Sequence, residues 1–283
     1  MTGFGDLPEP FADPARARVA IIPVPYDGTS TWLKGADRGP EAIIDASAHL
    51  ELYDIETGTE PYRRGILTDA PVSELSTPEA MAQAVEQRVA GHLQKGRFPV
   101  VLGGEHSVAI GAMRAAAARY AGVSFLQLDA HADLRPEYEG SSFNHACVMA
   151  RARELGPIVQ VGIRSLDASE LQGLDPRRVF YAERLRGRRG WARQVVRSLG
   201  RQVYLTLDLD VFDPSIMPST GTPEPGGLGW YQVLELAARL FREREVVGCD
   251  VVELAPSSNR TPDFLAAKLV YKLLAYRFQG EPP

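Results

Sequence analysis

Three short motifs place metal-binding side chains directly after apolar segments of the sequence. They read Gly-Gly-Glu-His-Ser, Asp-Ala-His-Ala-Asp and Asp-Leu-Asp-Val-Phe-Asp-Pro. Their candidate ligands are two imidazoles and four carboxylates, namely His106, Asp129, His131, Asp133, Asp208 and Asp210. In an extended segment residues i and i+2 point the same way, so the side chains within each Asp motif can converge on one point if that conformation persists.

The charge of this set predicts bound cations. Four carboxylates packed together without cations would repel one another and would be forced to take up protons. Two divalent metal ions would remove that penalty, with carboxylates bridging between them. An oxygen-rich set with two imidazoles and no thiolate favours Mn²⁺ over Zn²⁺.

Each motif also has an ordinary structural interpretation. An isolated Asp-x-Asp after a strand is usually a turn or a helix cap, and paired glycines commonly make a tight turn. Asp-Ala-His-Ala-Asp directly after a buried strand is less common and favours metal binding. Because all three motifs stand at successive strand ends, we interpret them together as one metal cluster.

The elements that must position these motifs follow from the pattern of apolar residues. Short runs rich in β-branched residues are expected to form strands at 19–22, 99–102, 123–128, 158–161, 179–181, 203–207 and 246–252. The longer amphipathic stretches are expected to form helices at 40–50, 79–95, 108–120, 146–155, 191–199, 231–243 and 264–278. Each strand is apolar on both faces, which is typical of a buried parallel sheet.

The alternation of strands and helices predicts an α/β fold with a doubly wound, mainly parallel sheet and helices on both faces. Ligands of such sheets bind outside the carboxyl ends of the strands, where the three motifs lie. The sequence contains no internal repeat and no linker long enough to divide it. We therefore expect a single domain over residues 1–283.

Composition and charge exclude several classes of function. The chain has 283 residues, is 45% hydrophobic and 24% charged, and carries a net charge of −5, which gives no reason to expect nucleic acid. Its apolar runs are too short to span a bilayer, and residues 1–14 lack the basic segment of a signal peptide. Cys147 and Cys249 are expected to be reduced. We predict a cytoplasmic protein without a nucleic-acid or membrane partner.

The same motifs resemble those of the ureohydrolase superfamily, which contains arginases, agmatinases and their relatives. The similarity runs from Pro23 to Glu253, and its most specific parts are 129–133 and 208–214. The resemblance, strongest to the agmatinase branch, implies a three-layer α/β/α fold and hydrolysis of a guanidinium group to urea and an amine. It also implies two Mn²⁺ per chain, held by the six candidate ligands, and assembly as a homotrimer or homohexamer.

Two positions depart from the pattern of the family. Many relatives have Asp before the first ligand histidine, where this chain has Glu105. They often have Ser two residues before Asp208, where this chain has Thr206. Glu105 is not expected to bind metal, and Thr206 retains a hydroxyl, so the expected ligand set is unchanged.

Hydrolysis of a guanidinium requires a nucleophile, an anion that orients the substrate and a proton donor. Two bound cations lower the pKa of a shared water toward ~7. Glu253 follows a buried strand, and its carboxylate could accept a bidentate pair of N–H donors. The resemblance places Glu253 at the guanidinium-binding position, and the alternative is a buried glutamate paired with Arg or Lys.

His145 and Thr222 complete the expected catalytic pocket. A group that titrates near neutral pH is needed to protonate the departing amine, and His145 resembles the histidine that moves protons in this family. By itself His145 could equally be a histidine at the start of a helix. Thr222 resembles a threonine that lines the guanidinium site, and its alternative is an ordinary turn residue.

The tail pocket decides which guanidino compound is the substrate. Residues 140–145 lack the Ser-Gly-Asn stretch with which arginases bind an α-carboxylate, whereas 143–149 resemble agmatinases. Asp167 corresponds to an arginase Asp that contacts the substrate amine, so it could bind a terminal ammonium. The run Asp-Ala-Ser-Glu is equally a capping sequence at a helix N-terminus, and the two interpretations stay open.

We therefore predict first the hydrolysis of agmatine to putrescine and urea. Aminopropylagmatine, guanidinobutyrate, arginine and formiminoglutamate follow as alternative substrates. Two different classes are a metal-dependent, deacetylase-like amidohydrolase and an inactive metal-binding homologue. The second Asp pair disfavours the first class, because such deacetylases are expected to use a single zinc site. The intact His145 and Glu253 disfavour the second.

Overall fold

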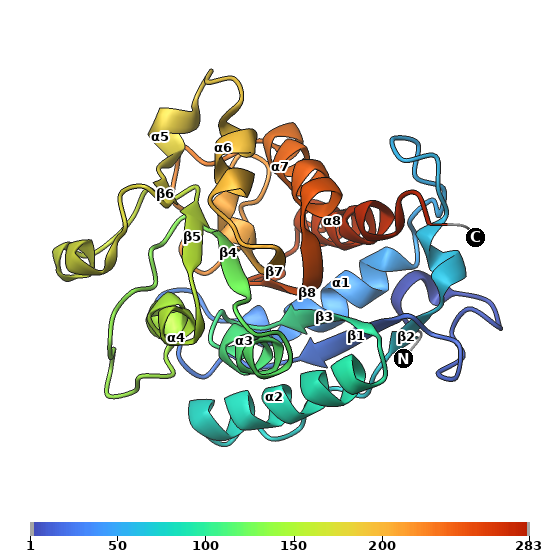
Figure 1. Cartoon of the computed structure of the whole chain (residues 1–283). Coiled ribbons are helices and arrows are strands. Elements are labelled where there is room, and N and C mark those ends of the chain that lie inside the picture. The colour runs from blue at the N-terminus through green and yellow to red at the C-terminus, as the bar shows by residue number, and fades with distance from the viewer. Residues whose placement is uncertain (1–2, 282–283) are drawn as a thin grey trace.

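The computed structural model describes residues 3–281, and its centre is an eight-stranded sheet (Figure 1). The strand order is β2-β1-β3-β8-β7-β4-β5-β6, and the strand pairs are parallel. The strands are β1 Val19–Val24, β2 Ile66–Thr68, β3 Phe98–Gly103, β4 Ser124–Leu128, β5 Ile158–Val161, β6 Val179–Phe180, β7 Gln202–Asp208 and β8 Glu245–Val252. The predicted parallel sheet is confirmed.

Helices cover both faces of the sheet. The α-helices of the described residues are α1 Gly39–Ser47, α2 Pro78–Gln94, α3 Val108–Arg119, α4 Val148–Leu155, α5 Ala182–Leu185, α6 Trp191–Arg197, α7 Trp230–Glu243 and α8 Thr261–Phe278. One face carries α2, α3 and α4, and the other carries α1, α6, α7 and α8 (Figure 1). The predicted three-layer α/β/α arrangement is confirmed. Within residues 3–281, no helix has the length and apolar character needed to cross a bilayer.

The strands are buried on both faces, which explains their unbroken apolar runs. In β1, Val19 and Ile21 pack into a core that contains residues of α1, α7 and α8, whereas Ala20 and Ile22 pack into a core with α2 and α3. Successive strand residues point to opposite faces, so a strand between two helical layers is apolar at every position.

One strand and one α-helix were not expected from the sequence, and another α-helix begins later than expected. The edge strand β2 pairs with β1 over three residues, and α5 has four residues. Both are too short for a hydrophobic period to show. The helix α4 begins at Val148 because His145–Cys147 form a 3₁₀ turn capped by Asn144, whose Oδ1 accepts from Ala146 N at 3.0 Å.

The central strands β3, β8, β7 and β4 are neighbours in the sheet. Because they are parallel, their carboxyl ends lie at the same edge, and the segments that follow them meet there. The predicted motifs follow β3, β4 and β7, and Glu253 directly follows β8. The topology therefore brings together residues separated by more than a hundred positions in the sequence.

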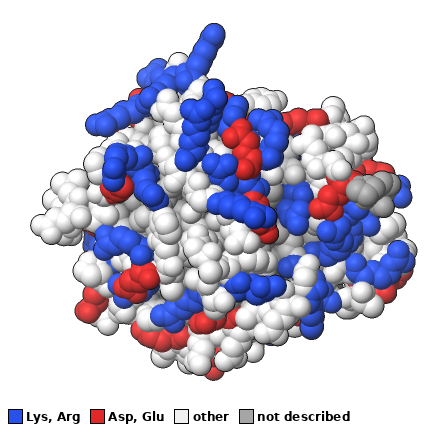
Figure 2. Space-filling model, viewed as in Figure 1, with Lys and Arg blue, Asp and Glu red and all other residues white. Residues whose placement is uncertain are grey.

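Basic side chains gather over α5 and α6, in the upper part of Figure 2. The exposed arginines of this region are Arg184, Arg186, Arg188, Arg189, Arg193, Arg197 and Arg201. None of them lines the pocket at the carboxyl ends of the strands. This surface is therefore separate from the candidate site.

Candidate metal centre

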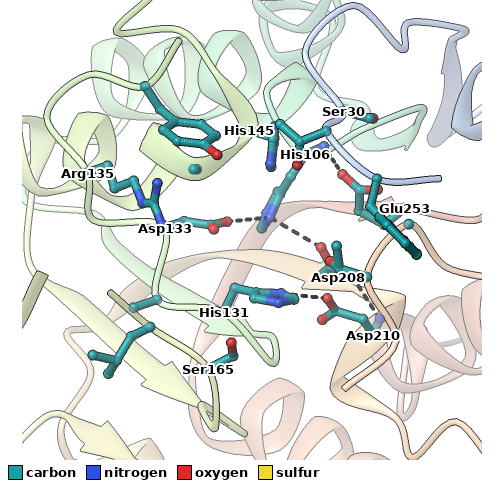
Figure 3. A pocket seen from close by; sticks show the side chains of 18 of the residues that line it. Ser30, His106, His131, Asp133, Arg135, His145, Ser165, Asp208, Asp210 and Glu253 are labelled. Carbon is teal, nitrogen blue, oxygen red and sulfur yellow. Dashed lines mark hydrogen bonds and ion pairs between the residues drawn. The ribbon is translucent and has the colours of Figure 1, made fainter. Parts of the chain in front are cut away.

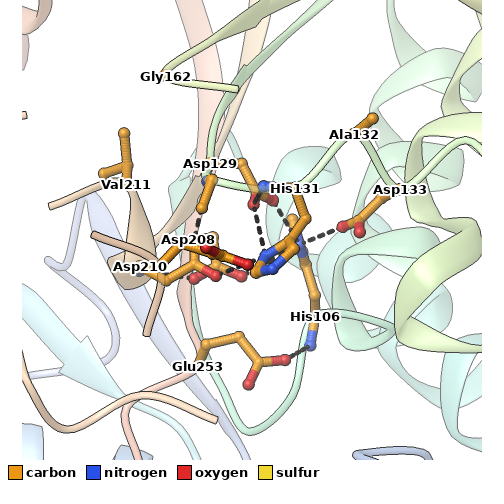
Figure 4. A network of polar contacts seen from close by, with 12 residues as sticks. His106, Asp129, His131, Ala132, Asp133, Gly162, Asp208, Asp210, Val211 and Glu253 are labelled. Carbon is orange, nitrogen blue, oxygen red and sulfur yellow. Dashed lines mark hydrogen bonds and ion pairs between the residues drawn. The ribbon is translucent and has the colours of Figure 1, made fainter. Parts of the chain in front are cut away.

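The six predicted ligands converge beyond the ends of β3, β4 and β7 (Figure 4). The first group surrounds His106, which follows β3. Its Nδ1 lies 3.2 Å from Asp129 Oδ2, 2.9 Å from Asp133 Oδ2 and 3.5 Å from Asp208 Oδ2. One imidazole nitrogen thus faces three carboxylates that come from two other strand ends.

A second group surrounds His131. Its Nδ1 lies 2.8 Å from Asp210 Oδ2 and 3.6 Å from Asp129 Oδ1. Ligand atoms of His106, Asp129 and Asp208 form one set within 4.8 Å of one another, and those of Asp129, His131 and Asp210 form another. The two sets share Asp129, as expected for two cations bridged by a carboxylate.

The backbone brings these side chains together differently from the sequence-based expectation. The residues after β4 do not stay extended, because Asp133 has a left-handed φ of +52°. Asp208 ends β7, and the next residues form a 3₁₀ helix in which Asp210 N donates to Asp208 Oδ1 at 2.8 Å. The expected extended conformation is therefore wrong for the second Asp pair, which converges through a tight turn.

The hydrogen bonds of His106 fix which nitrogen faces the cluster. Thr206 donates its hydroxyl hydrogen to Asp250 Oδ1 at 2.7 Å, so its oxygen accepts from His106 Nε2, 2.8 Å away. A neutral His106 therefore carries its lone pair on Nδ1, facing the carboxylates. A positive charge, either a proton or a metal ion, must lie between them. The donor set of imidazole and carboxylate fits a divalent metal.

Burial and mutual repulsion oppose the ionised carboxylates of this cluster. Burial, with the charge of Asp129 added to it, raises the pKa of Asp133 to about 7. Burial and the charges of Asp210 and Asp129 raise the pKa of Asp208 well above its ordinary value. Burial lowers the pKa of His106 and His131. The surrounding carboxylates raise it by more than burial lowers it, so the pKa of both histidines lies well above its ordinary value. The cluster thus holds an excess of negative charge that cations would balance.

Glu253 borders this cluster (Figure 3). Its φ is +68°, its N–H donates to Gly104 O at 2.8 Å, and its Oε1 accepts from His106 N at 2.7 Å. Its Oε2 lies next to Gly221: a Cβ atom added to that glycine would be 3.4 Å from the oxygen. Burial and the charge of Glu105 raise the pKa of Glu253 well above its ordinary value. One carboxylate oxygen is therefore fixed, and the other faces the pocket.

His145 lines the same pocket (Figure 3). Its backbone N–H donates to Thr29 Oγ1 at 3.0 Å, and its Nδ1 lies 3.2 Å from the same oxygen. The ring of Tyr138 packs edge-on against the imidazole, with centroids 6.1 Å apart. Burial lowers the pKa of His145 to about 4, and a hydrogen bond to the Thr29 backbone opposes that shift. The imidazole is therefore neutral at pH 7 and is held on two sides.

A pocket of about 270 Å³ joins these groups to the surface. The two predicted substrate-binding residues, Thr222 and Asp167, both line it, together with Trp32, which is 72% exposed. Asp167 is also the N-cap of the 3₁₀ helix Ala168–Gly173, and its N–H donates to Glu170 Oε2 at 2.7 Å to complete a capping box. The interpretation of Asp167 as a helix N-cap is confirmed, and Asp167 also lies on the pocket wall.

Two polar residues that hydrogen-bond to groups holding His106 and His145 in place were not predicted. Asp250 is fully buried in β8 and accepts the Thr206 hydroxyl that orients the first ligand histidine. A carboxylate inside an apolar strand was the signal that could have identified it. Thr29 contacts His145, which is 116 residues away, so no local pattern indicates the contact.

Comparison with known proteins identifies the family. The model of the Arginase family matches residues 17–275. The chain belongs to the arginase family. An N(1)-aminopropylagmatine ureohydrolase of Synechocystis sp. is 41% identical over 277 residues, which cover 93% of this chain and 90% of that protein. An agmatinase of Pyrococcus horikoshii is 32% identical, with 95% of each chain covered. The crystal structure of the agmatine ureohydrolase of Thermoplasma volcanium matches with a TM-score of 0.88 at 32% identity, covering 99% of this chain and 95% of that one.

The arginase-family match spans the whole candidate site. It begins before β1 and ends within α8, so the six candidate ligands, His145 and Glu253 all lie inside the matched region. The predicted ureohydrolase of the agmatinase branch, a metal-dependent hydrolase, is confirmed.

Proposed function

We propose that this arginase-family chain uses two Mn²⁺ ions to hydrolyse the guanidinium group of a linear guanidino-amine, releasing urea and an amine. The observation that carries the proposal is the pair of ligand sets that share Asp129, with Glu253 and His145 beside them in one pocket. Mn²⁺ is proposed because the donors are carboxylates and imidazoles, without thiolates.

The residues proposed to hold the two ions fall into two sets. The first is His106, Asp129, Asp208 and the adjacent Asp133, and the second is Asp129, His131 and Asp210. When bound, the two ions supply a water of lowered pKa as the nucleophile.

Glu253 is proposed to orient the substrate. Its Oε1 is held by the His106 backbone N–H, so the carboxylate cannot turn away, and its Oε2 can accept an N–H of the guanidinium. His145 is proposed to deliver a proton to the departing amine, and Thr222 to line the guanidinium site. Asp167, on the pocket wall, is placed to attract the cationic tail of the substrate.

We propose N1-aminopropylagmatine as the preferred substrate and agmatine as the second. The sequence alone placed agmatine first. Relatives from Synechocystis sp. and Thermus thermophilus that are named N(1)-aminopropylagmatine ureohydrolase are 41% identical, whereas the Pyrococcus horikoshii agmatinase is 32% identical. The longer substrate carries an extra ammonium toward the mouth of the pocket, where Asp167 and the ring of Trp32 lie. Its hydrolysis would give a triamine and urea.

Urea release by the Mn²⁺-loaded chain tests the proposal. The panel contains N1-aminopropylagmatine, agmatine, guanidinobutyrate and arginine, with formamide release measured from formiminoglutamate. We expect the highest kcat/KM with N1-aminopropylagmatine. Glu253→Gln should lower kcat/KM by about 10²-fold or more, and Glu183→Gln, at an exposed glutamate, is the matched control. No product from any compound, with two metal ions verified per chain, would contradict the proposal.

A homotrimer or homohexamer in the cytoplasm stays a prediction. The buried cysteines Cys147 and Cys249 are free, which suits a reducing compartment. Light scattering of the purified chain checks the assembly, with a mass of about three or six times 30.9 kDa expected.

A further inference from the structure

Two buried glutamines interrupt the apolar strands β4 and β5 beside the candidate metal centre. Gln127 and Gln160 are 0% and 1% exposed, and they are paired residues of the two neighbouring strands. A buried amide lowers the stability of a protein unless its polar atoms find partners. The hydrogen bonds of this pair lead from β5 through β4 to Asp129, the carboxylate shared by the two ligand sets.

A backbone carbonyl decides the orientation of both amides. Gln160 Nε2 lies 2.8 Å from Ala132 O and 2.6 Å from Gln127 Oε1. A carbonyl oxygen only accepts, so the atom of Gln160 that faces it must be the nitrogen. The atom of Gln127 that accepts from this nitrogen must then be its oxygen. The nitrogen of Gln127 therefore points the other way, where it donates to Asp129 Oδ2 at 2.7 Å and to His131 O at 3.3 Å.

The two amides use all of their hydrogens in this arrangement. Each NH₂ group carries two hydrogens, and each makes two hydrogen bonds. One bond joins the glutamines to each other, and the other three end on the motif 129–133, at the Asp129 side chain and at the carbonyls of His131 and Ala132. The glutamines therefore hold both the shared carboxylate and the backbone that follows it.

Both oxygens of the Asp129 side chain accept from neutral donors. Oδ2 accepts from Gln127, and Oδ1 accepts from the His131 backbone N–H at 2.5 Å. Oδ2 lies 3.2 Å from His106 Nδ1 in the first ligand set, and Oδ1 lies 3.6 Å from His131 Nδ1 in the second. Because the two donors are uncharged, they fix the plane of the carboxylate without replacing the cations that its charge requires.

We propose that Gln127 and Gln160 are positioning residues that hold Asp129 in the orientation in which each of its oxygens serves one ligand set. Gln127 acts directly on Oδ2, and Gln160 acts through Gln127 by donating to its oxygen. The binding of two Mn²⁺ ions rests on the proposed function, whereas the orientation of Asp129 rests on the hydrogen bonds of the chain alone. A carboxylate that is already oriented loses little rotational freedom when ions bind, so it binds them more tightly than a free one.

The Mn²⁺ affinity of the whole chain tests the proposal, with free Mn²⁺ measured by its EPR signal during a titration. Gln127→Met keeps the length of the side chain and removes its amide, and we expect the dissociation constant to rise about 10- to 100-fold. Gln160→Met should raise it by a smaller factor, because Gln127 can still donate to Asp129. The matched control is Gln202→Met in β7, where the amide donates to Glu245 and the constant should not change. An unchanged constant in folded Gln127→Met would overturn the proposal.

The double variant distinguishes a relay from two independent contacts. If Gln160 acts through Gln127, the constant in Gln127→Met/Gln160→Met should rise by less than the product of the two single factors. A rise equal to that product would overturn the role of Gln160. Melting temperatures of the metal-free variants report any loss of folding separately. With saturating Mn²⁺, KM for the guanidino-amine should stay within about twofold, because the substrate contacts are unchanged.

Crystal structures of the wild type with and without Mn²⁺ provide a test that needs no variant. We expect the hydrogen bond from Gln127 to Asp129 and the same plane of the carboxylate in both structures. A carboxylate that turns when Mn²⁺ binds would overturn the proposal. A wild type that binds two Mn²⁺ ions and releases no urea would contradict the proposed function alone, and the dissociation constants of the variants would still decide the inference.

Discussion

The protein buries two clusters of charged side chains that differ in whether their charges are balanced. One lies where α8 meets the segment after α1. There the buried pair of Lys272 and Asp54 brings Nζ and Oδ2 to 3.0 Å, and Glu56, whose side chain is 53% exposed, accepts from Lys272 at 2.6 Å and from Tyr276 at 2.8 Å. The other is the candidate metal centre, where the carboxylates outnumber the two imidazoles.

The pKa values show what this difference means. Burial acts against the charge of Asp54, but hydrogen bonds from Thr57 and Lys272 outweigh it and hold the pKa of Asp54 below its ordinary value. In the metal centre burial and like charges prevail, so the pKa of Asp133 rises to about 7 and that of Asp208 rises well above its ordinary value. In the pair of Lys272 and Asp54 the protein's own residues neutralise the buried charge. In the candidate metal centre the same neutralisation requires bound cations.

The largest expected effect comes from removing one carboxylate of the metal centre. Asp208→Asn should lower urea release at least ~10³-fold, because metal-ion catalysis supplies several kcal/mol of transition-state stabilisation. The free energy of unfolding of the metal-free protein should stay equal or rise, since one repelling carboxylate is gone. Asp37→Asn, at an exposed aspartate, should change neither quantity. A metal-free Asp208→Asn protein that is strongly destabilised would show that the cluster is structural.

The second-largest effect is expected from removing the buried ammonium group of Lys272, which neutralises Asp54. Lys272→Met should lower the free energy of unfolding by about 3–5 kcal/mol, because it leaves Asp54 buried and unpaired. The double variant Lys272→Met/Asp54→Asn should recover the larger part, as an amide oxygen can still accept from Thr57. Denaturant unfolding measures these values, with Lys95→Met as an exposed control. Loss of metal binding in folded Lys272→Met would mean that the clusters are coupled.

Metal binding itself should stabilise only one of the two clusters. Mn²⁺ at 100 times its dissociation constant should add about 2.7 kcal/mol per site to the free energy of unfolding. Asp129→Asn, which alters the carboxylate shared by both ligand sets, should abolish most of this gain, and Lys272→Met should keep it. Thermal melts with and without Mn²⁺, together with elemental analysis, provide the measurement. An unchanged two ions per chain in Asp129→Asn would contradict the shared-ligand assignment.

The smallest expected effect is the pH dependence of the balanced cluster. The pKa of Asp54 is lowered in the folded chain, so its stabilisation is fully present above the unfolded value of about 3.9 and is lost as pH falls through the lower folded value. The difference in melting temperature between the wild type and Asp54→Asn should therefore be constant near neutral pH and narrow below about pH 4. If the difference in melting temperature already narrowed between neutral and mildly acidic pH, a group other than Asp54 would cause the pH dependence.

The sequence predicted the parts of the molecule that depend on local pattern. Strands buried on both faces leave apolar runs, so the sheet could be predicted. The motif 129–133 has suitable side chains directly after one of these runs, so the sequence also indicated which candidate ligands would lie together. The 3₁₀ turn that joins Asp208 to Asp210 could not be predicted, because the same residues are also compatible with an extended chain. Asp250 and Thr29 act through partners 44 and 116 residues away, and only the folded chain shows such contacts.

The position of β8 determines when the metal centre can form. β8 is the last strand of the described chain, yet it lies in the middle of the sheet, between β3 and β7. Before β8 is synthesised, the sheet can exist only as two halves, one carrying His106 and the other carrying Asp129 and Asp208. Pairing across such sequence distances is slow. The ligand set of Asp129, His131 and Asp210 lies on one half, whereas the set that needs His106 can form only after β8 joins the two halves.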